Sequence, residues 1–234
     1  MASVDRSAVG REVKLRPDRF SGSMYVDPFS PHAVESISSL VKDEGLRILK
    51  YESSESTGLM GMHPGLTFDA PVFRPIWEMV DEAELTVVID PGPIDGAAYQ
   101  VESLRIVMER YPKAHFVIAH LGFPDQSRLR KSEYRNRWWS MVSLAKSRNT
   151  WLEISAMPYF FSAEEYPFPG AVELIVQAGS EVGIDKLVWG SDIPGTLQYA
   201  TYRQMIAFID RNATFSESDK RLIFRENAIR AFSL

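Results

Sequence analysis

Short apolar runs alternate with amphipathic stretches along almost the whole chain. Each run has the length of a β-strand, and together they cover residues 20–26, 46–51, 85–89, 115–122, 150–155 and 187–189. Between the first two runs, Val34, Ile37 and Leu40 recur at helical spacing, and similar stretches follow the later runs. Strands spaced by roughly 25–40 residues with helices between them indicate repeated βαβ units and a parallel sheet.

Glycine, proline and capping residues mark where the elements end. The first helix is expected to have Ser30 as its N-cap, Pro31 in its first turn and Gly45 just past its end. The run 85–89 stops at Asp-Pro-Gly-Pro, which no regular strand continues through. Ser216 and Asp219 form the pattern of a capping box for the last helical segment.

Two parallel architectures compete for this pattern, an open doubly wound sheet and a (β/α) barrel. Neither a Gly-x-Gly-x-x-Gly pattern nor a Walker-type loop follows any of the runs, which weakens the nucleotide-binding version of the open sheet. The sequence therefore predicts an α/β fold, a TIM-type (β/α) barrel that is incomplete, with about six of the eight βα units. Residues 1–234 show no linker or change of composition, so we expect a single domain.

Composition narrows the classes of function. The chain has 234 residues, 45% hydrophobic and 24% charged, as ordinary soluble globular proteins have. The net charge of -5 argues against nucleic acid as the main partner, and the lack of a long apolar run argues against a membrane span. The first residues do not resemble a signal peptide, so a cytoplasmic location is expected. Because the chain has no cysteine, any metal must be held by His, Asp or Glu.

Polar side chains follow the apolar runs at the points where the strands end. They are Asp27, Lys50, Asp90, His120, Ser155 and Asp192. The carboxyl ends of the strands of a (β/α) barrel meet at one mouth, where such enzymes build their active sites. The pattern therefore predicts a site around these residues, with a small-molecule substrate.

Each candidate also has a structural interpretation. His120 either transfers a proton near neutral pH or is an ordinary core histidine. Asp90 either binds a divalent cation or caps its Pro-Gly-Pro turn. Lys50 either binds an anionic substrate or pairs with a neighbouring acid, and His63 either touches substrate or is an exposed loop histidine. Asp192 is a site residue or a turn aspartate.

Several segments in this order resemble the amidohydrolase-related family of metal-dependent TIM-barrel hydrolases and decarboxylases, the group of aminocarboxymuconate-semialdehyde decarboxylase. They are residues 16–20, 26–28, 45–50, 119–122 and 190–194, together with Asn227 and Ala228. The resemblance implies one divalent metal, commonly zinc, with Asp192 as a metal ligand and His120 as the histidine that activates water. Asp90 stands where the family has a metal-binding histidine, and the family's first-strand His-x-His pair has no counterpart here. An oxygen-rich site of this kind would suit Mn or Mg.

The leading hypothesis is a metal-dependent hydrolase that acts on a small carboxylated or lactone-like substrate through a metal-activated water. Three alternatives stay open: a decarboxylase of the same family, a metal-free enzyme that uses an Asp–His pair, and a catalytically inactive barrel fragment that serves as a binding or assembly subunit. The expected six units leave the barrel open on one side. Either the chain is shortened, or a partner or second copy covers that side in a homo-oligomer, or the sheet closes differently.

Overall fold

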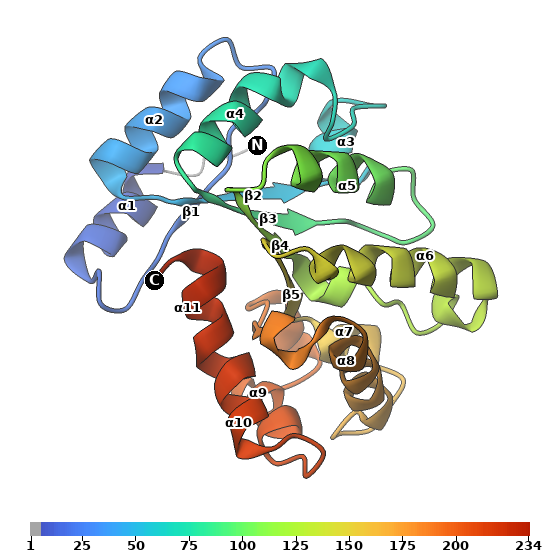
Figure 1. Cartoon of the computed structure of the whole chain (residues 1–234). Helices are drawn as coiled ribbons and strands as arrows, with labels where there is room; N and C mark the ends of the chain where they lie inside the picture. Colours follow the sequence, from blue (N-terminus) through green and yellow to red (C-terminus); the bar gives the residue numbers. More distant parts are fainter. Residues whose placement is uncertain (1–5) are drawn as a thin grey trace.

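A six-stranded parallel sheet runs through residues 6–234, which the computed structural model describes (Figure 1). Its strands are β1 (Ser23–Met24), β2 (Ile48–Glu52), β3 (Thr86–Asp90), β4 (His115–Ile118), β5 (Thr150–Ile154) and β6 (Leu187–Trp189). They lie in the order β1-β2-β3-β4-β5-β6, so each strand pairs with its neighbours in sequence. This order has no point at which the sheet reverses direction, and it matches the expected incomplete barrel rather than a doubly wound sheet.

Two strands are shorter than the sequence predicts. Only two residues of the run 20–26 pair with β2, and β1 lies at the edge of the sheet, where it has a single partner strand. The run 115–122 leaves the sheet after Ile118, where His120 and Leu121 adopt left-handed backbone angles. A left-handed residue cannot continue a strand, so the chain turns there.

Helices separate the strands. They are α1 (Arg6–Leu15), α2 (Ala33–Glu44), α3 (Leu59–Met62), α4 (Arg74–Glu82), α5 (Val101–Arg110), α6 (Ser132–Ser143), α7 (Met157–Phe160), α8 (Pro169–Val182), α9 (Tyr202–Asp210), α10 (Glu217–Arg221) and α11 (Asn227–Phe232). In Figure 1, α2, α4, α5 and α6 follow one face of the curved sheet, whereas α11 lies on the other.

The predicted helix boundaries are correct at two places and wrong at one. Gly45 ends α2 in a left-handed conformation, and Ser216 and Asp219 form the expected capping box of α10. The prediction that Ser30 caps α2 is wrong, because the helix starts at Ala33 and its N-cap His32 makes no side-chain capping bond. Two consecutive turns precede the helix. In the first, the Ser30 amide donates a hydrogen bond to the Asp27 carbonyl, and in the second, the Ala33 amide donates to the Ser30 carbonyl.

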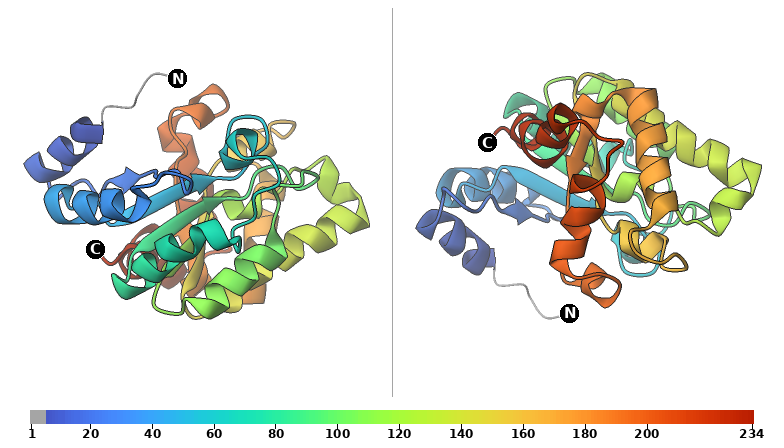
Figure 2. Two further views of the ribbon diagram at one scale, coloured as in Figure 1. Left: turned by 90° about the horizontal axis from the view of Figure 1, so that it is seen from above. Right: turned by 90° about the horizontal axis from the view of Figure 1, so that it is seen from below.

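The concave face of the sheet has its own small core. Apolar side chains from five strands pack there against α11, namely Ile48, Val88, Val117, Trp151 and Val188, together with Ala119 just after β4 and Ala231 of the helix. The Thr86 hydroxyl donates a hydrogen bond of 2.9 Å to the Ala231 carbonyl, and the Asn227 amide donates to the Ile184 and Leu187 carbonyls. The last helix therefore covers the inner face near the amino ends of the strands (Figure 2).

In the part of the chain that the structure describes, no helix is both long and apolar enough to span a membrane.

Candidate active site

Strand periodicity places charged side chains above the inner core. Side chains two residues apart in a strand share a face, so Lys50 follows Ile48, Asp90 follows Val88, and Glu153 follows Trp151 on the concave side. All three lie toward the carboxyl ends of their strands. The sheet therefore changes from apolar to charged along its inner face, and the charged end faces the mouth.

A turn in an uncommon backbone conformation presents His120. His120, Leu121 and Gly122 have φ values of 57°, 49° and 72°, which are strained for the two residues that carry a Cβ. Two buried side chains hold this turn from behind. The Trp138 indole donates a 2.8 Å hydrogen bond to the Leu121 carbonyl, and the Tyr99 hydroxyl donates a 2.6 Å bond to the Gly122 carbonyl. Packing of α6 and of the segment before α5 thus determines where His120 points.

The His120 imidazole is hydrogen-bonded through both ring nitrogens. Its Nε2 lies 3.2 Å from Oδ2 of Asp90, and its Nδ1 lies 2.8 Å from the Ser155 hydroxyl. The side chains of His120 and Asp90 are only 9% and 14% exposed. The other oxygen of Asp90 accepts a hydrogen bond from the Gly92 amide, so Asp90 caps its Pro-Gly-Pro turn, while its role as a cation ligand stays a prediction.

The charges of this cluster act on one another. Burial lowers the pKa of His120, but the hydrogen bond and charge of Asp90, with the charges of Glu153 and Asp192, outweigh burial and raise it overall. Burial raises the pKa of Asp90, yet the bond to His120 and the charges of His120 and Lys50 bring it below its ordinary value. Both shifts favour an imidazolium–carboxylate pair.

Glu153 is a member of this cluster that sequence reasoning missed. Burial raises its pKa, as does the charge of Asp192, while His120, Lys50 and Ser155 oppose the shift without cancelling it. A side chain at Gly190 would collide with it, because a Cβ there would lie 2.0 Å from Oε1 of Glu153. The available signal was an acid at an inward position of an otherwise apolar strand, two residues after Trp151.

Asp192 stands at the end of β6 in a left-handed conformation, with φ of 52°. It is exposed, and its Oδ2 lies 3.4 Å from the buried Thr196 hydroxyl, which donates to it. Its charge influences His120 and Glu153, so it belongs to the same electrostatic cluster. Lys50 is also exposed at this mouth.

His63 has a different partner from the other candidates. Its Nε2 lies 2.9 Å from Oδ1 of Asp27, and its ring packs against Phe29 at 4.3 Å between centroids. The long loop 52–69 therefore places a second Asp–His pair beside the end of β1. Both side chains are partly exposed, at 22% and 39%.

The donors present do not form a ready metal centre. Within residues 6–234, no group of three or more His, Asp or Glu side chains converges as a set of ligands. Both oxygens of Asp90 already accept hydrogen bonds, from His120 and Gly92, and Asp192 is bonded to Thr196. The assignment of Asp90 and Asp192 as metal ligands stays a prediction, and no chemical step through a metal follows from this arrangement.

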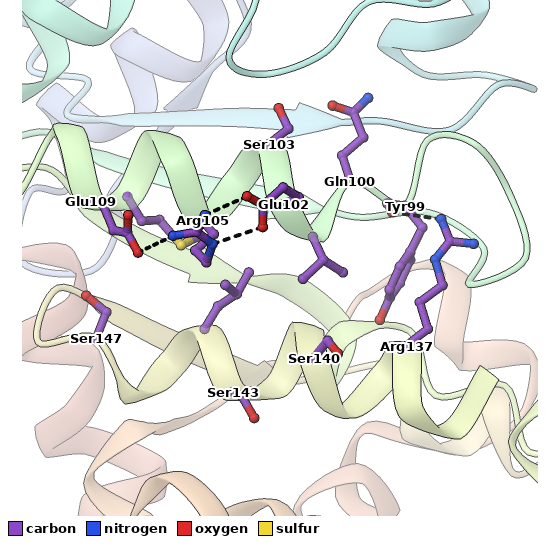
Figure 3. A pocket seen from close by; sticks show the side chains of 13 residues that line it. Tyr99, Gln100, Glu102, Ser103, Arg105, Glu109, Arg137, Ser140, Ser143 and Ser147 are labelled. Atoms are coloured by element: carbon purple, nitrogen blue, oxygen red, sulfur yellow. Dashed lines mark hydrogen bonds and ion pairs between the residues drawn. The ribbon is translucent and has the colours of Figure 1, made fainter. Parts of the chain in front are cut away.

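A groove of about 790 Å³ lies elsewhere, between α5 and α6 on the outer face (Figure 3). Its charges are paired within the groove. Arg105 bridges Glu102 and Glu109, and Arg137 donates to the carbonyls of Ile94, Gly96 and Tyr99. Arg105 pairs within α5, and Arg137 joins α6 to the segment before α5, so these charges have structural partners and the cluster around His120 is the better candidate for chemistry.

A parallel (β/α) sheet with acid and base side chains at its strand ends is the arrangement in which barrel-type enzymes build their active sites. The chain belongs to the amidohydrolase family, since the sequence model of that family matches residues 3–234. A γ-resorcylate decarboxylase of Rhodococcus jostii is 22% identical over 97% of this chain and 74% of its own length.

Solved structures share the fold. An amidohydrolase of Burkholderia multivorans with bound zinc superposes with a TM-score of 0.76 at 16% identity, over 99% of this chain and 80% of the other. A probable 2-pyrone-4,6-dicarboxylic acid hydrolase of Acinetobacter baumannii, with citric acid bound, gives 0.76 at 19% identity, over 98% and 79%. The expected fold, an incomplete barrel of the amidohydrolase type, is thereby confirmed.

Proposed function

We propose that this chain is a decarboxylase that acts on a small carboxylated, electron-rich substrate, with His120 as the group that transfers the proton. The observation that carries the proposal is the hydrogen-bonded unit of Asp90, His120 and Ser155 at the carboxyl ends of adjacent strands. The likeness to a γ-resorcylate decarboxylase along nearly the whole chain supports the same reaction class.

Decarboxylation needs an acid. The bond between the carboxyl carbon and the adjacent carbon of the substrate breaks, and carbon dioxide leaves. The electron pair left on that adjacent carbon then takes up a proton. The raised pKa of His120 favours the imidazolium, which can supply that proton. Asp90 holds the Nε2 proton, so the Nδ1 proton is the one delivered, through the Ser155 hydroxyl that it faces. Solvent then restores the imidazolium.

Charge around the cluster suits a carboxylated substrate. Lys50 provides an ammonium at the mouth that neutralises the substrate's carboxylate on binding. His63, backed by Phe29, would contact the substrate from the long loop. The charges of Glu153 and Asp192 help to raise the pKa of the His120 imidazole, which favours its protonated form.

Hydrolysis of a small carboxylated or lactone-like substrate is the second candidate. The structural likeness to a probable pyrone dicarboxylic acid hydrolase favours it. This function would use Asp90 and Asp192 as ligands of zinc, manganese or magnesium, and the metal would supply an activated water. The two functions therefore differ in the group that does the chemistry, a metal-activated water in hydrolysis and the His120 imidazolium in decarboxylation.

The deciding experiment incubates the protein with hydroxybenzoates and with pyrone lactones in D2O, each with chelator and with added Mn²⁺ or Zn²⁺. We expect release of carbon dioxide and a product with deuterium at the substrate carbon that carried the carboxyl group. Ring opening that depends on added metal would favour hydrolysis instead. If neither reaction occurs with any metal, the proposal is wrong and the alternative of a binding or assembly subunit gains support. Sedimentation would then test for the homo-oligomer which that alternative requires.

A further inference from the structure

A hollow of about 800 Å³ lies at the opposite end of the sheet from His120. Its wall comes from the turns that lead into β3, β4, β5 and β6, together with α11. We call it the N-terminal basin, and its chemistry comes from Lys113, His115, Arg148, Trp151, Lys186 and Arg230. Neither the proposed reaction nor the core of the barrel uses these charges.

The cations of the N-terminal basin have no carboxylate partners. Among residues 6–234, none of Lys113, Arg148, Lys186 and Arg230 forms an ion pair within 4.0 Å. Two acids, Glu84 and Asp185, also line the basin, so cations outnumber carboxylates by four to two. The whole chain has the opposite balance, with 26 Lys and Arg against 31 Asp and Glu. Positive charge is therefore concentrated here.

Like charges are held close together in the basin. The Lys186 ammonium donates to the Ser147 and Arg148 carbonyls at 2.8 and 2.9 Å and lies 4.9 Å from the centre of the Trp151 ring. Burial lowers the pKa of Lys186, Asp185 opposes this, and the charge of Arg230 lowers it further. A bound anion would relieve this repulsion.

A residue that lines the same basin, His115, has an unpartnered polar atom. Nδ1 of His115 is buried and has no hydrogen-bond partner among the described residues. Leaving such an atom unsatisfied is energetically unfavourable, so native structures seldom do it without a reason. The ring lies 5.2 Å from that of Trp151, beside Lys186. An oxyanion in the basin would give a protonated Nδ1 its missing acceptor.

We propose that the N-terminal basin binds a compact anion with two or more negative charges, of which inorganic phosphate is the simplest. Arg148 and Arg230 supply guanidinium groups that match two oxygens of such an anion, and Lys113 and Lys186 add point charges. Polycarboxylates share this chemistry. The ligand binds at the amino ends of the strands, so it is a separate ligand from the substrate at the mouth.

The test is calorimetric titration of the protein with inorganic phosphate and with citrate at constant ionic strength. We expect saturable binding of at least one of them with a dissociation constant of about 1 mM or lower. The double variant Lys113→Gln/Arg148→Gln should bind about tenfold more weakly or worse. The matched control Lys42→Gln/Arg11→Gln removes the same charge from exposed positions on α2 and α1 and should bind as the parent does.

Two further measurements keep the outcome decisive. The imidazole resonances of His115 should shift on titration, whereas those of His63 should not. Lys50→Gln, which changes the mouth, should leave binding unchanged. Tighter binding of phosphate than of citrate identifies a phosphate-type ligand, and the reverse identifies a polycarboxylate. The proposal is overturned if neither anion saturates, if the Lys113/Arg148 variant binds as well as the parent, or if Lys50→Gln abolishes binding.

Discussion

The two ends of the parallel sheet carry charge in opposite ways. At the carboxyl end, His120 and Asp90 form a hydrogen-bonded pair within a cluster of both signs. At the amino end, Lys113, Arg148 and Lys186 lack ion pairs among the described residues, and a buried His115 nitrogen has no partner. The first end pairs its charges internally, as the proposed proton transfer requires. The second has an excess of cations, as the proposed anion site requires.

Substitutions at the two ends of β4 test this difference most directly, because His115 begins the strand and His120 lies just beyond its end. His120→Asn should lower the turnover of the best substrate about 10²–10⁴-fold, the usual contribution of a general acid. His115→Asn, its matched control, should leave turnover within about twofold, since His115 belongs to the other end. Steady-state kinetics of both variants on the same substrate would measure the two losses of turnover. Equal losses would mean that the histidines act through the stability of the strand.

Support of the His120 turn should have the next largest effect. Tyr99→Phe keeps the buried ring but removes the donor to the Gly122 carbonyl, leaving a buried acceptor unsatisfied. We expect a loss of about 1–3 kcal/mol in the free energy of unfolding, measured by urea denaturation. Tyr199→Phe, at an exposed tyrosine, should change stability by less than about 0.5 kcal/mol. An unchanged Tyr99→Phe protein would mean that the turn needs no such support.

Gly190→Ala should disturb the carboxyl end without affecting the amino end. The new Cβ would lie 2.0 Å from Oε1 of Glu153, so that side chain must move. We expect destabilisation of about 1 kcal/mol, the typical cost of a point substitution. In the double variant Gly190→Ala/Glu153→Ala, where the space is free, the penalty of the glycine change should shrink. Additive losses would show that Gly190 serves the backbone rather than Glu153.

The free energy of unfolding should depend on pH through the His120–Asp90 pair at the carboxyl end. His120 has a raised pKa in the folded state, so its contribution is fully present below its ordinary pKa of about 6.5 and is lost as pH rises through the raised value. A tenfold gain in the proton affinity of the imidazole on folding corresponds to about 1.4 kcal/mol of stability. The parent should therefore lose stability relative to His120→Asn between neutral and alkaline pH. Parallel curves for the two proteins would contradict the ion pair.

The smallest effect is expected at the amino end. Lys113→Gln/Arg148→Gln removes exposed cations that form no ion pair within residues 6–234, so stability at low ionic strength should stay the same or rise by less than about 0.5 kcal/mol. Thermal unfolding at low and high salt would measure it. A clear loss of stability would reveal a structural role for these cations and weaken the contrast between the two ends.

Local pattern predicted much of the fold, and the reasons are visible in particular elements. The runs at 46–51, 85–89, 150–155 and 187–189 are strands because they are apolar, of strand length and ended by turn residues. The start of α2 was misplaced because the Asp27 and Ser30 carbonyls close consecutive turns first, which Ser30 and Pro31 alone do not reveal. The end of β4 was extended too far because the turn at His120 is held by Trp138 and Tyr99, both distant in sequence.

The candidate site was predicted in part. His120, Asp90, Asp192 and Lys50 were named from their places after the strands, and the structure brings them into one electrostatic cluster. The partnership of His63 with Asp27 depends on how the loop 52–69 folds back. Glu153 was not predicted as a site residue, because the burial of a single acid within a strand depends on neighbours such as Gly190 that are distant in sequence.

The sequence by itself determined the alternation of strands and helices, the parallel order that follows from it, and the delivery of polar residues at the strand ends, because these depend on local periodicity and on chain connectivity. Only the tertiary structure decided which of those residues share a hydrogen bond, which charges stay unpaired, and how α11 covers the inner face. Those features depend on contacts between segments that lie far apart in the chain, such as Asp90 with His120 and Thr86 with Ala231. Burial and neighbouring charge then set the protonation states, which no local pattern of residues encodes.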